Sequence, residues 1–278
     1  MSTHPYTLLD VFTDRPLAGN GLAVVHEADG VDDATMLAFA KETLLSETTF
    51  VQASETADYR NRIWTVTAEI PFAGHPSLGT AVAVSLQRGE QDVEYRQQTH
   101  AGIQPVRVER EGDRAYASVL QEPAVFGAEA DAAAIMAAVG LRPEDAHPEL
   151  PPQHVSTGLP TLIAPLVDAA ALTRARKDQA AVAALADSAI NLYLCAVDGR
   201  AASARMFPSE LEGEDPATGS AAGPLLAYLN ARTGRDRVEI AQGVEMGRPS
   251  RLVAEMEDGR ARVGGDVVVL VTGSLRLP

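Results

Sequence analysis

The chain has 278 residues, of which 46% are hydrophobic and 22% charged, a composition typical of one large or two moderate folded domains. A formal net charge of −15 argues against non-specific binding to nucleic acid or anionic membranes, and no apolar run is long enough to cross a bilayer. The single cysteine, Cys195, excludes an intrachain disulfide and a multi-cysteine metal site. The first residues lack a signal-peptide pattern, so we expect a cytoplasmic protein.

The first half of the chain contains strand-like runs and two segments with helical character. Period-two and apolar patterns predict strands at 6–12, 22–26, 48–52 and 60–67. Asp32 and Asp33 cap a helix that runs through Leu44, and a second helix begins at Gly74-His75 and ends near Arg88. Two further runs, 104–110 and 114–121, are typical of a hairpin.

The second half repeats this order. Strands are predicted at 192–197, 203–207 and 238–242, a helix from 218–220 to about 232, and a hairpin over 251–263. Arg62-Ile63-Trp64 precedes Gly74 by about the same stretch as Arg205-Met206-Phe207 precedes Gly219. The pattern indicates duplicated domains with largely antiparallel sheets, joined by a linker at about 122–153 that contains a short helix at 131–139.

The two helix starts are the most informative local features. A helix that begins at Gly74-His75 or at Gly219-Ser220 directs unpaired backbone N–H groups outward, with the positive end of the peptide dipoles behind them. Two such starts indicate one anionic substrate held by both halves. His75 could move a proton or bind a carboxylate there; the alternative is a histidine that only caps the helix.

Two carboxylates accompany these helix starts. Glu47 precedes a strand and could be a general base, or it could be a solvated loop residue. Asp215 could contact substrate, or it could only stabilise the helix dipole. Asn20, between two glycines, is interpreted as a turn residue. The acidic and basic residues around the helix starts are interpreted as structural ion pairs, Arg62 with Glu69 and Arg205 with Glu214.

Nucleotide and metal sites have no support in the sequence. It contains neither a glycine-rich dinucleotide motif nor a phosphate-binding loop, and its histidines are dispersed without the spacing of metal ligands.

Five blocks taken together resemble the signature blocks of the PhzF family, the phenazine-biosynthesis group of isomerases. They occur in family order over almost the whole chain, at 47–50, 71–76, 205–207, 215–223 and 242–249. The resemblance implies an α+β, diaminopimelate-epimerase-like fold of two similar domains, each a mostly antiparallel curled sheet around a central helix. The expected domains are 1–122 and 123–278, with the last strand able to return to the first domain. The active site is expected in the cleft between the domains.

The resemblance also implies the chemistry. The family's catalytic glutamate, histidine and aspartate correspond to Glu47, His75 and Asp215, and its carboxylate-binding backbone corresponds to Gly74, His75, Gly219 and Ser220. The implied enzyme is a homodimeric isomerase without cofactor or metal. It moves a proton within a small unsaturated or cyclic carboxylic acid, of the trans-2,3-dihydro-3-hydroxyanthranilate type, with Glu47 as general acid and base.

Two other classes stay open. A catalytically silent small-acid binding protein could keep the same fold, and a hydrolase or lyase could use the same carboxylates. Racemisation by two thiols is excluded because the chain has one cysteine, which lies outside both helix starts.

Overall fold

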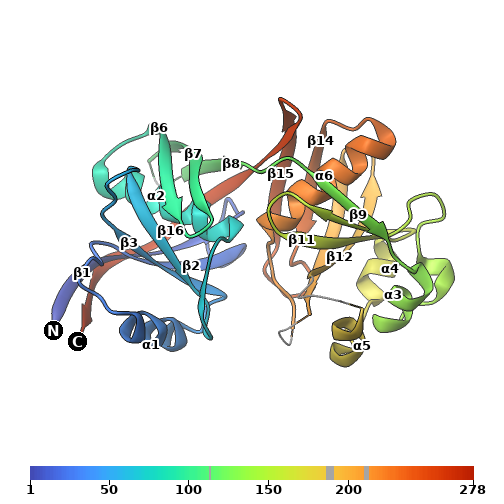
Figure 1. Ribbon diagram of the computed structural model, residues 1–278, viewed down its shortest axis with the longest axis horizontal. Helices are drawn as coiled ribbons and strands as arrows, with labels where there is room; N and C mark the ends of the chain where they lie inside the picture. Colours follow the sequence, from blue (N-terminus) through green and yellow to red (C-terminus); the bar gives the residue numbers. More distant parts are fainter. Residues whose placement is uncertain (113, 186–190, 210–212) are drawn as a thin grey trace. The chain divides into compact units, whose positions relative to one another are not determined.

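The structure is a computed structural model that describes residues 1–112, 114–185, 191–209 and 213–278. The chain divides into two compact units, each combining strands with few helices, so the fold class is α+β. Unit 1 consists of Met1–Leu120 together with Gly264–Pro278, and unit 2 consists of Gln121–Val263 (Figure 1).

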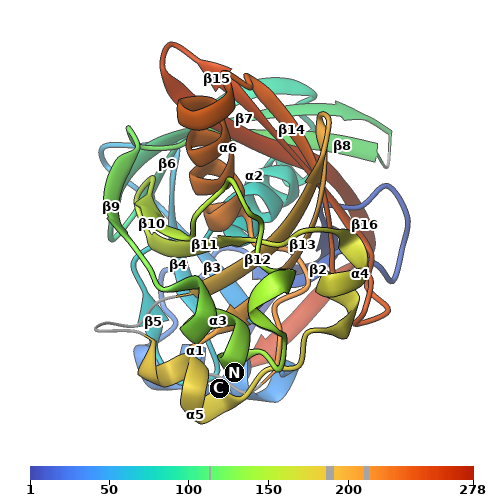
Figure 2. The same ribbon diagram turned by 90° about the vertical axis from the view of Figure 1, so that its right-hand side faces the viewer.

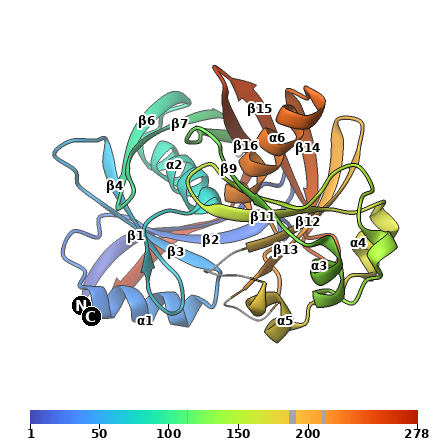
Figure 3. The ribbon, with the colours of Figure 1, turned by 45° about the vertical axis from the view of Figure 1, so that its right-hand side comes forward.

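The strands of unit 1 follow the order β1-β2-β3-β4-β6-β7-β8-β16, and β16 also pairs with β1, which joins the two ends of this order. The first and last strands of the chain are therefore neighbours, with Ser2 opposite Leu277, and the two chain ends lie side by side (Figure 3). The short strand β5 pairs with β4. The bounds are β1 Ser2–Val11, β2 Asn20–Val25, β3 Glu47–Gln52, β4 Tyr59–Trp64, β5 Glu69–Ile70, β6 Asp92–Thr99, β7 Gly102–Glu111, β8 Arg114–Leu120 and β16 Arg260–Leu277.

Helix α2, Gly74–Arg88, packs against β1, β2, β3, β4, β6, β7 and β8, and its residues from Gly74 to Ser85 are buried. Gly79 permits this close packing, because a Cβ atom there would lie 2.6 Å from the side chain of Leu22 and 2.8 Å from that of Leu9. Helix α1, Asp33–Thr43, belongs to a separate apolar cluster with β3 and β4. The strands of unit 1 thus enclose α2 from its first residue to Ser85.

Unit 2 is built in the order β16-β15-β14-β13-β12-β11-β10-β9, in which only the start of β16 belongs to this unit. Helix α6, Gly219–Thr233, packs against β10, β11, β14 and β15 (Figure 2). A second apolar cluster unites α3, α4 and α5 with β11, β12 and β13. The bounds are β9 Val125–Glu129, α3 Ala132–Ala138, the 3₁₀ helix η1 Pro143–Asp145, β10 Gln153–Ser156, β11 Pro160–Pro165, α4 Ala169–Arg174, α5 Gln179–Ala184, β12 Asn191–Asp198, β13 Ala201–Pro208, β14 Arg237–Gln242 and β15 Ser250–Glu257.

Both units use the same sequence of strand pairings. In unit 1, β2 and β3 are parallel, β3 and β4 antiparallel, and β4 and β6 parallel. In unit 2, β11 and β12 are parallel, β12 and β13 antiparallel, and β13 and β14 parallel. The long helix follows the third strand of each series, α2 after β4 and α6 after β13. The similar spacing from Arg62 to Gly74 and from Arg205 to Gly219 reflects this repeated connection.

The prediction of a linker at 122–153 is wrong. The short helix expected there is present as α3, but its Ile135 and Met136 are fully buried in the apolar cluster of unit 2, and the stretch also contains β9, which pairs with β10. Its proline and acidic residues resemble those of a linker because the segment consists of short elements with exposed outer faces. Cys195 is fully buried in β12. Among the described residues, no helix is both long and apolar enough to span a membrane.

Candidate functional site

Glu47 and Asn20 occupy the same end of two neighbouring parallel strands. Glu47 is the first residue of β3 and Asn20 the first of β2, and the register pairs Leu22 with Glu47. The side chain of Glu47 is 16% exposed, whereas Asn20 is buried. Parallel pairing therefore brings the partly shielded carboxylate of Glu47 and the buried amide of Asn20 together at the N-terminal ends of β2 and β3.

His75, the second residue of α2, lies next to these strand ends. Its Nε2 atom is 3.3 Å from the Oε2 atom of Glu47, a contact without the alignment of a hydrogen bond. On the other side of the ring, Nδ1 is 3.1 Å from the amide nitrogen of Asn20. The hydrogen bond with Asn20 is therefore made at Nδ1, and Nε2 is the ring nitrogen nearest Glu47.

Burial lowers the pKa of His75 to about 3, and a backbone hydrogen bond with Gly21 opposes only part of this change. The imidazole is therefore neutral near neutral pH, and its contact with Glu47 is not an ion pair. A neutral ring can donate a hydrogen bond without adding a positive charge that would favour the ionised form of the carboxylate. The neutral ring therefore places no positive charge beside the Glu47 carboxylate.

We predict that His75 stays neutral in the folded protein between about pH 5 and pH 8. Its ¹⁵N ring signals, assigned by their loss in His75→Gln, should remain those of a neutral imidazole. In Asn20→Asp, a carboxylate replaces the amide next to Nδ1, so the pKa of His75 should rise. A wild-type ring that gains its second proton within this range would contradict the assignment.

The start of α2 carries no side-chain cap. The residue before the helix is Ala73, which has no polar side chain, and both the amide and the hydroxyl group of Ser77 donate to the Ala73 carbonyl oxygen. The N–H groups of Gly74 and His75 have no partner within the helix, by the geometry of its first turn. A buried helix start of this kind favours an anion that accepts from these N–H groups.

Unit 2 has a second helix start, at α6. Thr218 precedes the helix, and its hydroxyl group donates to the Oδ2 atom of Asp215, which is half-buried. Gly219 and Ser220 are the first helical residues, and Thr218 makes no side-chain hydrogen bond to the helix amides. The predicted residues Asp215, Gly219 and Ser220 therefore lie together around one helix start.

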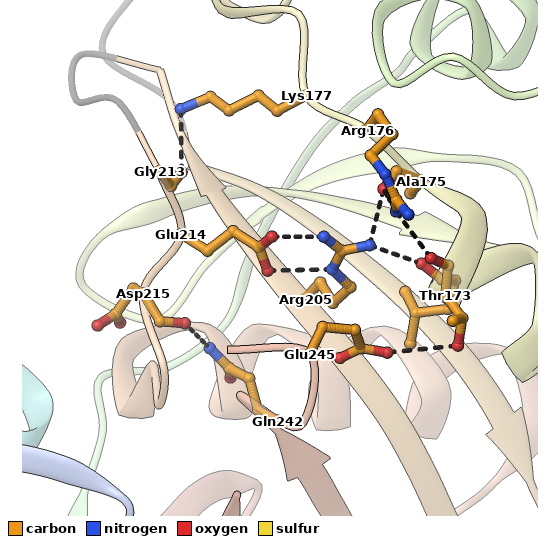
Figure 4. Close-up of polar contacts among 11 residues, drawn as sticks. Thr173, Ala175, Arg176, Lys177, Arg205, Gly213, Glu214, Asp215, Gln242 and Glu245 are labelled. Atoms are coloured by element: carbon orange, nitrogen blue, oxygen red, sulfur yellow. Dashed lines mark hydrogen bonds and ion pairs between the residues drawn. The ribbon is translucent and has the colours of Figure 1, made fainter. Parts of the chain in front are cut away.

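Two ion pairs support the segments that lead to these helices. Arg62 binds Glu69 through two nitrogen atoms, and its guanidinium group lies 5.5 Å from the ring centre of Trp64. Arg205 binds Glu214 in the same way, next to Asp215, and also donates to the carbonyl oxygens of Leu172 and Ala175 (Figure 4). These pairs were interpreted as structural, and the structure confirms that interpretation.

Some residues of the site were not identified from the sequence. Asn20 was interpreted as a turn residue, but it begins β2 and binds His75. Gln242, at the end of β14, binds both Asp215 and Thr218, whereas its place in the sequence indicated no binding role, only a strand end and the start of the 242–249 block. Within the described part of the chain, no group of three or more His, Cys, Asp or Glu residues could hold a metal ion.

Comparison with known proteins places the chain in a family. Residues 9–274 match the family model PhzC-PhzF, described as phenazine biosynthesis-like protein. Trans-2,3-dihydro-3-hydroxyanthranilate isomerase of Pseudomonas aeruginosa is 37% identical over 94% of this chain and 93% of its own length. The solved structure of a predicted epimerase from the same species is 39% identical, with a TM-score of 0.86 over 98% of this chain and 99% of the other.

A hydroxyproline epimerase from Agrobacterium vitis shares the fold at 11% identity, with a TM-score of 0.65 over 98% of this chain and 92% of its own. The shared fold is a mixed-sheet α+β architecture. The chain belongs to the PhzC-PhzF family and is a PhzF-like isomerase.

Proposed function

We propose that this isomerase moves a proton within a small unsaturated or cyclic carboxylic acid, by a reaction of the trans-2,3-dihydro-3-hydroxyanthranilate type. The observation that carries the proposal is the contact between Glu47 and the buried His75, 3.3 Å apart at the start of α2. The name of the Pseudomonas aeruginosa relative, 37% identical over nearly the full chain, supports the substrate class.

Glu47 is the proposed general acid and base. Its carboxylate would take the proton from C3 of the ring acid and return it to C1, after which the enol product tautomerises to a ketone. One group suffices for both steps because the carboxyl group formed when Glu47 removes the first proton can protonate C1, and its proton can exchange with solvent between the two steps. Neutral His75 would hold Glu47 in place from one side, and a positioned acid–base group of this kind contributes about 10²–10⁴-fold to the rate.

The carboxylate of the substrate is proposed to accept hydrogen bonds from backbone N–H groups of Gly74, His75, Gly219 and Ser220. Such donors stabilise an anion without placing a competing cation next to Glu47. Asp215 would orient the substrate or relay a proton. The uncapped starts of α2 and α6 within their own units support these assignments.

The remaining features of the proposal rest on the family resemblance. We propose that the enzyme needs no cofactor or metal, acts as a homodimer, and works in the cytoplasm on a free small acid. The two units are proposed to be similar domains of the diaminopimelate-epimerase-like fold, with one long central helix in each.

Incubation with trans-2,3-dihydro-3-hydroxyanthranilate in D₂O tests the reaction. We expect an isomer of unchanged composition that carries solvent deuterium at the new C–H position, detected by mass spectrometry and NMR. Binding without product or exchange would instead favour a catalytically silent binding protein. A product that has gained water or lost a fragment would favour a hydrolase or lyase, and either result would refute proton migration.

A further inference from the structure

Gln242 is a fully buried amide whose hydrogen bonds converge on the start of α6. Its Nε2 group donates to the backbone oxygen of Asp215 at 2.7 Å and to the hydroxyl oxygen of Thr218 at 2.9 Å. Its Oε1 atom accepts from the Tyr193 hydroxyl at 2.9 Å and from the Thr218 amide at 3.2 Å. Burial raises the pKa of Tyr193, so this hydroxyl stays protonated and remains a donor. Both polar atoms of the Gln242 side chain therefore make two hydrogen bonds each within the protein.

The hydrogen bond from Gln242 determines what the Thr218 hydroxyl can do. A threonine that precedes a helix ordinarily accepts a hydrogen bond from the second or third helical N–H group. Here the hydroxyl oxygen accepts from Gln242 and its hydrogen goes to Asp215, and no bond to the helix amides is made. Thr218 is thus a residue type that commonly caps helices, but its hydroxyl group is bound to Gln242 and Asp215 instead of to the N–H groups of α6.

The loop that follows Gln242 holds the same turn from a second direction. A Cβ atom on Gly243, whose φ is +73°, would lie 2.6 Å from the carbonyl oxygen of Pro216. The hydroxyl group of Ser250 donates to this same oxygen at 2.9 Å. Figure 4 shows the Gln242 amide directed at the backbone of Asp215, while the Asp215 carboxylate points away from it. The backbone from Asp215 to Thr218 is therefore fixed by residues from the end of β14 and the start of β15.

We propose that Gln242 is a positioning residue that keeps α6 uncapped and thereby reserves the N–H groups of Gly219 and Ser220 for the substrate carboxylate. This inference rests on the proposed function, in which those N–H groups bind the substrate. In unit 1 the start of α2 is also uncapped, because the residue before it is Ala73, which has no side-chain acceptor. Gln242 also sets the direction of the Asp215 carboxylate, through the hydrogen bond that Thr218 donates to it.

The first test is structural and needs no substrate. In a crystal structure of Gln242→Leu, the Thr218 hydroxyl should turn to the helix and accept from the N–H group of Ser220 or Ala221. A Thr218 hydroxyl that stays on Asp215 and leaves the helix uncapped would overturn the proposal. This outcome does not depend on the identity of the acid, so it is separable from a failure of the proposed function.

The second test uses kinetics with trans-2,3-dihydro-3-hydroxyanthranilate. Gln242→Leu should raise KM by about tenfold or more, the factor that corresponds to one lost hydrogen bond to a charged group. Thr218→Val has no hydroxyl with which to cap the helix, so adding it to Gln242→Leu should restore part of the lost affinity. If the changes in binding free energy calculated from KM for Gln242→Leu and Thr218→Val add up in the double variant, Gln242 does not act through Thr218.

Gln97→Leu is the matched control, because Gln97 is also fully buried and accepts from the hydroxyl group of Tyr59 and the amide of Asn61 in unit 1. It should lower thermal stability as Gln242→Leu does, yet leave KM unchanged. An equal rise of KM in both variants would assign the effect to general loss of stability and refute a positioning role.

Discussion

Glu47→Gln should lower kcat by about 10²–10⁴-fold, because the amide can neither accept the proton from carbon nor return it. The fold should persist, since glutamine has nearly the same size and the position is only partly shielded at the start of β3. KM should change little, because the proposed carboxylate-binding groups are backbone amides elsewhere. The measurement is single-turnover conversion of trans-2,3-dihydro-3-hydroxyanthranilate, with deuterium exchange from D₂O as a second readout.

Glu42→Gln provides the matched control. Glu42 lies in the last turn of α1, five residues before Glu47 in the sequence, and is exposed. Glu42→Gln removes one negative charge from the same region as Glu47→Gln does, so a long-range electrostatic effect on kcat would appear in both variants. A Glu47→Gln enzyme with wild-type kcat would rule out Glu47 as the acid and base.

Arg205→Met should cost about 3–5 kcal/mol of unfolding free energy, the usual result of removing one partner of a buried ion pair. The side chain of Arg205 is 5% exposed, and that of its partner Glu214 is 19% exposed. Methionine would leave the Glu214 carboxylate without its cation and the carbonyl oxygens of Leu172 and Ala175 without their donor. Urea unfolding monitored by circular dichroism measures the loss.

Arg107→Met tests whether burial is the cause. Arg107 and Glu94 form an ion pair at 2.7 Å, but their side chains are 49% and 48% exposed. Exposed pairs contribute about 0–1 kcal/mol, so this variant should unfold close to the wild type. Equal losses for Arg107→Met and Arg205→Met would refute the buried-charge explanation.

The residues that the sequence identified well are those whose signals are local. Gly74-His75-Pro76 and Thr218-Gly219-Ser220 combine small residues with an apolar run, and both segments do begin helices. Glu47 and His75 are distant in sequence, and their proximity was expected only from the family resemblance; the structure brings them into contact. The pairings of Arg62 with Glu69 and Arg205 with Glu214 span 7 and 9 residues, short enough to be anticipated from the order of elements.

Asn20 and Gln242 could not be identified in this way. Asn20 meets His75 across 55 residues, and Gln242 meets Asp215 across 27, so neither contact follows from a local periodicity. Gln242 opens the 242–249 block, but the block does not show which groups its side chain binds. The flanking glycines of Asn20 favour a turn locally, whereas pairing of β2 with β1 makes it a strand residue. A polar residue at the end of a predicted strand is ordinarily exposed, and only the packed structure shows that Gln242 is buried.

The pairing of β16 with β1 has a consequence for the order of folding. A ribosome releases the N-terminal strand early, but the partner of Ser2 is Leu277, which is synthesised after the whole of unit 2. All residues of unit 2, Gln121–Val263, are therefore available before β1 can pair with β16. During synthesis, unit 2 can therefore fold completely before unit 1. Until β16 is made, β1 has one unpaired edge, which could pair wrongly with other chains unless a chaperone covers it.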